Sequence, residues 1–263
     1  MTQRYKNLLI FSHPDDELLW SSSWLRECDL IIICFGPSLL NCDLTANRAS
    51  ALAHHPFKQK LISLNIAESN VLGDADWTVP NISEFGLSLK RKNHHYENNF
   101  RVLIDKLRPY VTSAENIITH NPWGEYGHEE HVQVYRAVSY FHSEHQFNIL
   151  YNLYVSDRSL KLMLLYESIL NSSDTLSKSI DQKLSNDCMG VYIESGAWTW
   201  PENYIFHDYE FFVIENSLGK VDQKSSHMVM LLNMNFSNDI TIKIFIKRKL
   251  KKMFKFMKTF FHV

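Results

Sequence analysis

The fold is decided by residues 7–35, NLLIFSHPDDELLWSSSWLRECDLIIICF, where two apolar runs enclose a helical pattern. Residues 7–11 and 30–35 are continuous apolar runs of strand length, as expected for parallel strands covered on both faces of a sheet. Between them, residues 17–26 carry apolar side chains at helical spacing: Leu18, Leu19, Trp20, Trp24 and Leu25. This order predicts a parallel strand–helix–strand unit at the start of the chain.

The same alternation continues through the first half of the chain. A helix is predicted from Thr45, as its N-cap, through Leu52 towards Leu64, with Pro56 expected to break or kink it. A helix ending before Pro109, a strand, a helix and a strand are then predicted over residues 98–107, 116–119, 130–141 and 149–155. Residues 171–187, rich in Ser, Asn and Asp, are expected to form a loop. The order predicts an α/β fold with a Rossmann-like, mostly parallel sheet and helices on both faces.

Length and composition describe a globular chain. Its 263 residues suffice for a large core, and 45% hydrophobic with 21% charged residues excludes a disordered chain or a disulfide-stapled miniprotein. We expect one domain over residues 1–242, with a motif-bearing core over 5–142, a less regular substrate-shaping part over 143–242, and a separate segment over 243–263. The four cysteines form no CxxC pair, which argues against a thiolate zinc site. Reduced cysteines and the absence of a signal-peptide pattern favour the cytoplasm.

The net charge of −2 is unevenly distributed. No acidic residue follows Asp239, whereas eight lysines and arginines do, so the tail carries about +8 and the rest of the chain about −10. A body this acidic argues against nucleic acid as a partner.

The basic tail has an amphipathic pattern. Over residues 246–261, apolar side chains share one helical arc and the basic side chains occupy the other. Such a helix is typical of an anionic membrane surface, where each nearby cation contributes about 1 kcal/mol. This hypothesis predicts a peripheral location on the inner face of the cytoplasmic membrane. The alternative is a helix docked on the acidic body.

The first polar motif is residues 12–17 (SHPDDE), where the first strand meets a helix. Neighbouring carboxylates need a cation or protons to balance their charge. His13 and Asp16 can reach one metal ion from a turn, which leaves Asp15 free to act as a base. In the alternative interpretation, the acids only cap the helix that starts near Glu17.

The second polar motif is residues 119–131 (THNPWGEYGHEEH), which also follows a predicted strand. One of its two spaced histidines, His128 or His131, would complete a two-histidine, one-carboxylate set with His13 and Asp16. Such a set suits catalytic Zn²⁺ and can also hold Fe²⁺. The alternative is that both histidines are ordinary surface residues. Because ligands gather at the carboxyl ends of parallel strands, the two motifs are expected to share one site.

Together, residues 13–17 and 126–131 resemble the PIG-L/LmbE-like N-acetylglucosaminyl deacetylases, a resemblance that covers roughly residues 5–142. It implies that His13, Asp16 and His131 are the metal ligands, usually of zinc. It also implies that Asp15 is the general base that activates water.

The resemblance assigns further roles in the second motif. His128 matches the residue that stabilises the tetrahedral intermediate and helps the amine to leave. Tyr126 matches a tyrosine that assists at the oxyanion. Glu130 stands where the family often has an aspartate that orients the neighbouring histidine.

Substrate contacts are also suggested. Residues 71–76 (VLGDAD) resemble a family segment that ends in an aspartate gripping sugar hydroxyls, which makes Asp76 the candidate. Arg48 is a candidate for a substrate-binding arginine, although Ala51 follows where the family has an acid. Trp123 either stacks on a sugar ring or anchors the core. The histidine doublets at residues 54–55 and 94–95 are expected to be solvated surface.

The resulting hypothesis is metal-dependent hydrolysis of the acetamide of an N-acetylhexosamine, lipid-linked if the tail binds a membrane. A soluble N-acetylglucosamine conjugate is the alternative substrate. Two other classes stay open: a catalytically silent sugar- or lipid-binding protein on the same fold, and a peripheral membrane scaffold.

Overall fold

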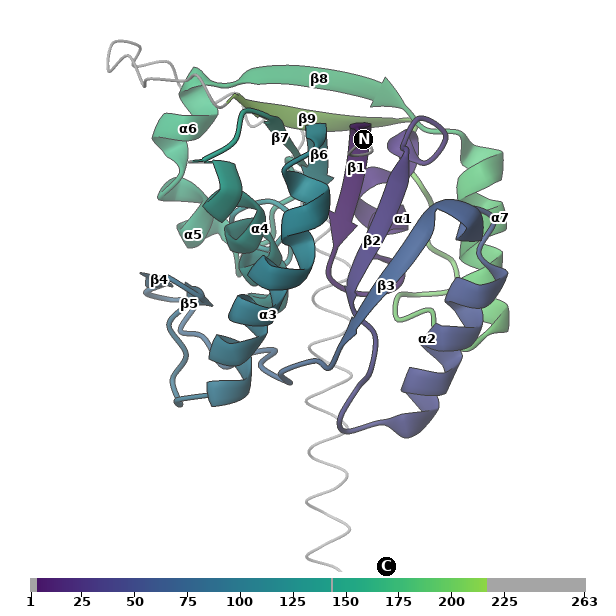
Figure 1. Ribbon diagram of the computed structural model, residues 1–263, viewed down its shortest axis with the longest axis horizontal. Coiled ribbons are helices and arrows are strands. Elements are labelled where there is room, and N and C mark those ends of the chain that lie inside the picture. The colour runs from purple at the N-terminus through teal and green to yellow at the C-terminus, as the bar shows by residue number, and fades with distance from the viewer. Residues whose placement is uncertain (1–3, 143, 217–263) are drawn as a thin grey trace, which may run out of the picture. The chain divides into compact units, whose positions relative to one another are not determined.

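A seven-stranded sheet forms the centre of the computed structural model, which describes residues 4–142 and 144–216 (Figure 1). The strand order is β3-β2-β1-β6-β7-β9-β8. The first five of these are parallel, whereas β9 is antiparallel to both β7 and β8. The strands span Tyr5–Phe11 (β1), Leu30–Phe35 (β2), Leu61–Ile66 (β3), Ala114–Thr119 (β6), Asn148–Asn152 (β7), Asp174–Ser179 (β8) and Tyr209–Asn216 (β9). The predicted α/β fold with a mostly parallel sheet is confirmed.

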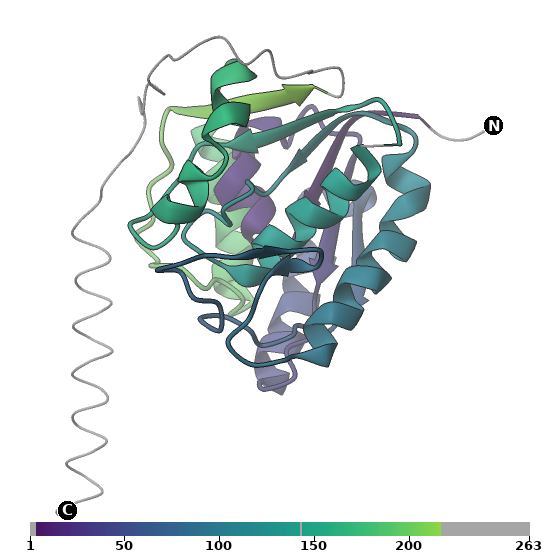
Figure 2. The same cartoon turned by 90° about the vertical axis from the view of Figure 1, so that its left-hand side faces the viewer.

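Helices cover the sheet on both sides (Figures 1 and 2). Helices α1, α2 and α7 pack together on one face, and α3 and α4 pack on the other. The helices span Asp16–Ser21 (α1), Cys42–His54 (α2), His94–Val111 (α3), Glu129–His142 (α4), Leu160–Leu164 (α5), Glu167–Ser172 (α6) and Gln182–Glu194 (α7). Because both faces are covered, β2 is buried along its whole length, in agreement with its continuous apolar sequence.

The helix predicted from Thr45 towards residue 64 is wrong in its bounds. Helix α2 is capped by Asn41, whose Oδ1 accepts the Leu44 N–H at 3.0 Å, and it ends at His54. Pro56 accounts for the end, because proline lacks an N–H and disfavours helical geometry in the residue before it. The chain after it forms strand β3 instead.

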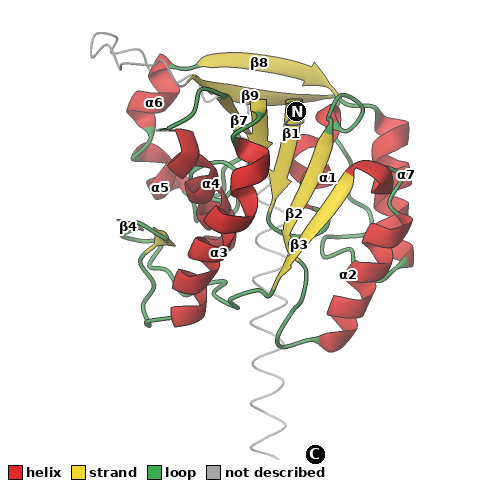
Figure 3. Ribbon diagram, viewed as in Figure 1, coloured by secondary structure: helices red, strands yellow, loops and turns green. Residues whose placement is uncertain are grey.

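Two other predicted elements differ from the structure. Helix α3 continues through Pro109 to Val111, since a proline in the last turn removes only one hydrogen bond there. The segment 171–187, expected to be a loop, contains strand β8 and the beginning of α7 (Figure 3). Strand β8 lies at the edge of the sheet and is mostly exposed, so its sequence lacks the apolar pattern of a buried strand.

The parallel strands bring their carboxyl ends to one edge of the sheet. The loops after β1, β3 and β6 therefore lie close together, and they carry residues 12–15, 67–72 and 120–128. A small hairpin of β4 (Ile82–Ser83) and β5 (Gly86–Leu87), which lies between β3 and α3 in the sequence, packs against α4. This edge is where the two polar motifs meet.

No helix in the described part of the chain is long and apolar enough to cross a membrane. All four cysteines are free, and only Cys42 is exposed. The amphipathic segment 246–261 lies outside the described residues, so the membrane and docking hypotheses both stay predictions.

Candidate metal centre and pocket

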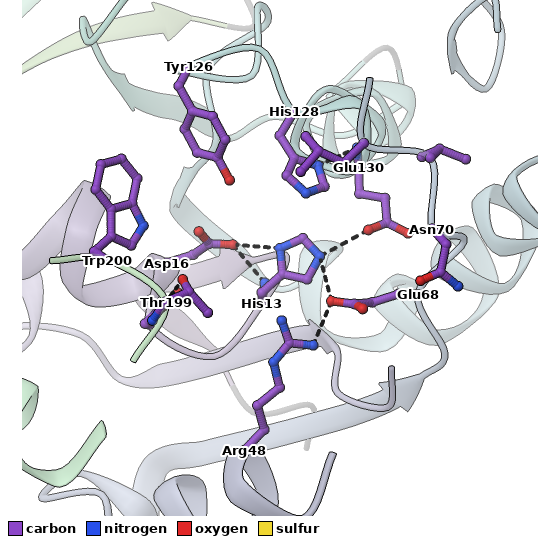
Figure 4. A pocket seen from close by; sticks show the side chains of 13 residues that line it. His13, Asp16, Arg48, Glu68, Asn70, Tyr126, His128, Glu130, Thr199 and Trp200 are labelled. Carbon is purple, nitrogen blue, oxygen red and sulfur yellow. Dashed lines mark hydrogen bonds and ion pairs between the residues drawn. The ribbon is translucent and has the colours of Figure 1, made fainter. Parts of the chain in front are cut away.

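A cavity of about 270 Å³ opens at the carboxyl edge of the sheet (Figure 4). Segments far apart in the sequence supply its walls: both polar motifs, helix α2, the loop after β3 and the loop after α7. The lining residues are His13, Asp15, Asp16, Arg48, Glu68, Asn70, Val71, Leu72, Tyr126, His128, Glu130, Thr199 and Trp200. Figure 4 shows Tyr126 and Trp200 on one side of His13 and Asp16, with Glu68 and Asn70 on the other.

Asp16 is fixed so that one of its oxygens faces two histidines. Its Oδ1 accepts the Trp20 Nε1–H at 3.0 Å, and its Oδ2 accepts the His13 backbone N–H at 2.7 Å. The same Oδ2 lies 3.2 Å from His13 Nδ1 and 3.3 Å from His131 Nε2. Ligand atoms bound tetrahedrally to one zinc ion lie about 3.3 Å apart, so these separations fit two edges of a zinc coordination shell.

His131 has the protonation pattern of a metal ligand. Its Nδ1 lies 2.7 Å from Glu125 Oε2, an arrangement in which Nδ1 donates to the carboxylate. Its buried Nε2 has no hydrogen-bond partner among the residues that the structure describes. Carboxylates commonly orient a ligating histidine in this way and raise its basicity. The residues present therefore fit a divalent metal ion at this position.

The electrostatics of the pocket favour a positive charge at the same place. Burial lowers the pKa of His13, but hydrogen bonds to Asp16 and Glu130 raise it to about 10. Burial likewise lowers the pKa of His131, and the neighbouring carboxylates of Asp16 and Glu125 raise it to about 9. Burial would raise the pKa of Asp16, yet the neighbouring histidines hold it well below its usual range. Protons or a metal ion can supply this charge, so metal binding displaces protons.

Two other histidines lie close enough to be considered as ligands. His120 Nε2 accepts the Ser12 backbone N–H at 2.9 Å, so its lone pair is already used. His128 Nδ1 accepts the Glu130 backbone N–H at 3.2 Å, which places the proton of the neutral ring on Nε2. Burial and the nearby His131 and His13 hold the pKa of His128 well below its usual value. His128 is therefore a neutral donor facing the pocket.

Three groups of described residues have ligand atoms within 4.8 Å of one another: His13, His128 and His131; Asp16, His120 and His131; and His13, Glu68 and Glu130. The last of these contains neither Asp16 nor His131. Its carboxylates already accept hydrogen bonds from Arg48 and from the Ser69 backbone N–H. This group also leaves His131 Nε2 without a partner. The predicted set of His13, Asp16 and His131 is not itself one of the three compact groups found among the described residues. It combines the two contacts to Asp16 Oδ2 with the unpartnered His131 Nε2, and we keep it as the candidate ligand set.

The contacts described for the Glu130 carboxylate are with neither His128 nor His131, so they do not support the role of orienting the neighbouring histidine that the resemblance implied. Its Oε2 lies 3.0 Å from His13 Nε2, and its Oε1 accepts the Ser69 N–H. The side chain reaches across the pocket from the first turn of α4 to the loop after β1. Its contacts fit it to orient His13.

Asp15 lies beside the candidate ligands with its carboxylate in the pocket wall. Its Oδ2 accepts the Thr199 hydroxyl at 2.9 Å. Burial and the charge of Asp16 raise the pKa of Asp15 well above its usual value. Although Asp15 precedes helix α1, its side chain makes no capping hydrogen bond, so the interpretation of this acid as a helix cap is wrong.

Tyr126 also lines the pocket. Its ring centroid lies 5.4 Å from that of His131 and 5.5 Å from that of Trp200. Burial and the charges of Asp16 and Asp15 raise the pKa of Tyr126 well above its usual value, so its hydroxyl keeps its proton. The hydroxyl is therefore available as a donor.

Arg48 lines the pocket from α2. Its Nη1 contacts Glu68 Oε1 and donates to the Gly36 carbonyl at 3.3 Å, and its buried Nε has no partner in the described part of the chain. The acid that pairs with Arg48 is therefore Glu68, from the loop after β3. Sequence spacing within α2 could not reveal this partner.

Two candidate substrate residues do not reach the pocket. Asp76 is exposed, and its Oδ1 accepts the Thr78 N–H at 3.0 Å and the Thr78 hydroxyl at 2.6 Å. Trp123 is fully buried, and its Nε1–H donates to the Tyr154 carbonyl at 2.7 Å. Trp123 therefore anchors the core and has no free face for a sugar. The tryptophan in the pocket wall is Trp200.

The prediction for the histidine doublets holds for His54 and His94, which are exposed, but it is wrong for His55. His55 is buried, with its Nε2 3.4 Å from Glu17 Oε1. A histidine gives no periodicity signal of its own, so only the packing of α2 reveals that this one is inside.

Sequence reasoning missed several residues of this site. Glu125 was available within the second motif, as an acid between two glycines. Thr199 and Trp200 come from a segment with no recognisable motif, and only the tertiary structure brings them to Asp15 and Tyr126.

The support that Glu125 gives to His131 can be tested with a matched pair of variants. Glu125→Gln is expected to weaken zinc affinity about 10- to 100-fold, because the charge behind the ligating ring is lost. Glu129→Gln is the control: Glu129 is equally buried but accepts hydrogen bonds from the backbone N–H groups of Gly73 and Ala75. Competitive zinc titration measures both variants. Equal affinities for Glu125→Gln and the unmodified protein would contradict the assignment of His131 as a ligand.

Comparisons with known proteins place this geometry in context. No protein-family model matches the chain, and no curated protein matches it. The chain is similar to a solved structure described as a deacetylase–teicoplanin complex in the biosynthesis pathway of teicoplanin. The TM-score is 0.45 at 12% sequence identity, over 80% of this chain and 98% of that chain. A similarity this distant supports no conclusion about the reaction. The residues of the pocket are the basis for the function proposed below.

Proposed function

We propose that this protein is a metal-dependent amide hydrolase that removes the acetyl group from an N-acetylhexosamine unit of the N-acetylglucosamine type. One observation carries the proposal: His13 Nδ1 and the unpartnered His131 Nε2 both face Asp16 Oδ2 in a pocket that also contains Asp15 and His128. The resemblance of the two motifs to the PIG-L/LmbE-like deacetylases supports the same chemistry.

His13, Asp16 and His131 would hold the metal ion, which we take to be Zn²⁺, with Fe²⁺ as the alternative. When bound, such an ion polarises a carbonyl and makes hydroxide available near neutral pH. Asp15 lies next to this position in sequence and in the pocket, and it would accept the proton from the attacking water. The Thr199 hydroxyl holds the carboxylate in place for that transfer.

Two other residues that line the pocket, His128 and Tyr126, would supply hydrogen-bond donors. His128 carries its proton on Nε2 and would donate it in a hydrogen bond to the carbonyl oxygen, where negative charge develops. Because the neutral ring has no acidic proton to give up, the proton that Asp15 takes from the attacking water would pass to the leaving nitrogen. The Tyr126 hydroxyl would donate to the same oxygen. An amine leaves poorly until it is protonated, so a carboxylate that takes a proton from water and passes it on, beside two hydrogen-bond donors, suits amide hydrolysis.

The polar wall suits a sugar. Arg48, Glu68 and Asn70 lie together on the side of the pocket away from Tyr126 and Trp200 (Figure 4). A few well-placed polar groups in a small cavity are typical of a site that orients a ligand by its hydroxyl groups. We place the sugar ring here. The amphipathic segment 246–261 suggests a lipid-linked sugar on an anionic membrane surface.

The second candidate is a catalytically silent sugar-binding protein on the same fold. Loss of activity in such proteins commonly removes a ligand or the base, whereas this pocket keeps both. We therefore favour the enzyme.

Acetate release tests the proposal. Zinc-loaded full-length protein is incubated with lipid-diphosphate-linked N-acetylglucosamine, its nucleotide-diphosphate form and the free sugar. Release from the lipid-linked sugar alone is expected, because the amphipathic segment 246–261 suggests a substrate at a membrane. That result would support both the deacetylase activity and membrane binding by this segment. Release from a soluble form would keep the chemistry and reject the lipid carrier. Binding of these ligands without acetate release would favour the silent binding protein.

A further inference from the structure

A buried carboxylate lies directly behind the pocket and is not part of its wall. Glu17 is fully buried in α1, and its Oε2 accepts the Asp15 backbone N–H at 3.3 Å. Its Oε1 accepts the Tyr192 hydroxyl at 2.7 Å. Tyr192 belongs to α7, so this contact joins the candidate base to a helix more than 170 residues away in sequence.

His55 completes the surroundings of Glu17. Its Nδ1 accepts the Phe57 backbone N–H at 3.1 Å, so the proton of the neutral ring lies on Nε2. That nitrogen is 3.4 Å from Glu17 Oε1. Burial and the neighbouring Glu17 raise the pKa of Tyr192, which therefore keeps the proton that it donates. Glu17 Oε1 thus accepts the Tyr192 hydroxyl of α7, while the ring of His55, the residue after α2, packs beside it without a hydrogen bond to it.

Asp15 has a backbone conformation that requires such support. Its φ angle is 96°, in the left-handed region that residues other than glycine rarely adopt. Strained residues of this kind persist where the surrounding structure holds them, and they cluster at functional sites. Of the contacts that the structure describes for Asp15, Glu17 binds the backbone N–H and Thr199 binds the carboxylate.

We propose that Glu17 and Tyr192 are positioning residues that hold Asp15 in its reactive conformation. This inference rests on the proposed function, in which Asp15 is the general base. Neither residue lines the pocket, so both act through Asp15. The competing explanation is structural: any group that keeps α1, α2 and α7 packed would replace Glu17 without an effect on catalysis.

Glu17→Met and Glu17→Gln separate these explanations. Methionine keeps the approximate volume of glutamate but removes the acceptor, whereas the glutamine carbonyl can still accept the Asp15 N–H. We expect Glu17→Met to lower kcat about 100-fold with little change in KM, because small displacements of reacting groups have effects of this size. Glu17→Gln is expected to restore most of the lost rate. Zinc content should stay at one ion per chain in both variants.

Tyr192→Phe and Tyr135→Phe provide a second pair, which covers the case that Glu17→Met fails to fold. Each variant removes one buried tyrosine hydroxyl that donates to a glutamate, at 2.7 Å for Tyr192 and 2.8 Å for Tyr135. Tyr135 donates to Glu215, away from the pocket. Both variants should lower Tm to a similar extent, but only Tyr192→Phe is expected to lower kcat, by about tenfold.

A crystal structure of each zinc-loaded variant gives a readout that does not depend on turnover. In Glu17→Met or Tyr192→Phe, Asp15 is expected to leave the left-handed region or to lose its contact with Thr199. An unchanged Asp15 together with an unchanged kcat would overturn the inference, as would an equal loss of rate in Tyr135→Phe. If the unmodified protein releases no acetate, the proposed function fails, and the conformation of Asp15 in these structures decides the positioning role.

Discussion

Replacing Asp15 with asparagine is expected to lower kcat about a thousandfold while zinc stays bound. Asparagine has nearly the same shape and can still accept the Thr199 hydroxyl through its amide oxygen, but it cannot take a proton from water at neutral pH. General base catalysis contributes about 10²- to 10⁴-fold, which sets the expected size. The measurements are acetate release under saturating substrate and zinc content by metal analysis.

Asp187→Asn is the matched control, because Asp187 is exposed on α7 and does not line the pocket. It should behave as the unmodified protein does. A normal rate in Asp15→Asn would remove Asp15 from the mechanism. Loss of zinc in that variant would instead make Asp15 part of the ligand set.

Replacing His131 with alanine is expected to weaken zinc binding by more than about a hundredfold and to abolish turnover. Loss of a residue that only supports a ligand already costs about 10- to 100-fold in affinity, so loss of a ligand should cost more. The structure also implies that Asp16 loses one of the positive partners that hold its pKa low. Competitive zinc titration and metal content after dialysis measure the effect.

His128→Ala is the appropriate control for this variant. The two rings are stacked at 4.5 Å between centroids, so they share nearly the same surroundings, yet the lone pair of His128 Nδ1 already accepts a backbone N–H. His128→Ala should therefore keep one zinc ion per chain and lose rate. Retention of zinc in His131→Ala with its loss in His128→Ala would show that the ligand set contains the other histidine of the pair.

Much of the fold can be inferred from local sequence. The runs at residues 7–11 and 30–35 are so apolar that only strands covered on both faces explain them, and helix α4 agrees with the prediction to within one residue at each end. The sequence also predicts that the two polar motifs lie together, because each follows a strand and parallel strands bring their carboxyl ends to one edge of the sheet. These features depend on side-chain periodicity and on spacing within short segments.

Other features depend on contacts between distant segments. The polar strand β8 forms because it pairs with β9 at the sheet edge. The sequence of residues 174–179 has no apolar pattern from which a strand could be predicted. Arg48 pairs with Glu68 from another loop, and the orientation of Glu130 towards His13 depends on how α4 meets β1.

The surroundings of Asp15 show most clearly which features follow from local sequence and which depend on tertiary structure. The sequence alone identifies Asp15 as the candidate base, because its motif lies at the end of a strand and carries more carboxylates than a helix start requires. Thr199, which binds its carboxylate, and Tyr192, which binds Glu17, come from the far end of the described chain, and only the packing of α7 against α1 and α2 brings them near. Local sequence specifies which groups are reactive, whereas long-range packing decides which of them are held, buried and protonated, since burial and hydrogen bonding depend on neighbours that no short segment contains.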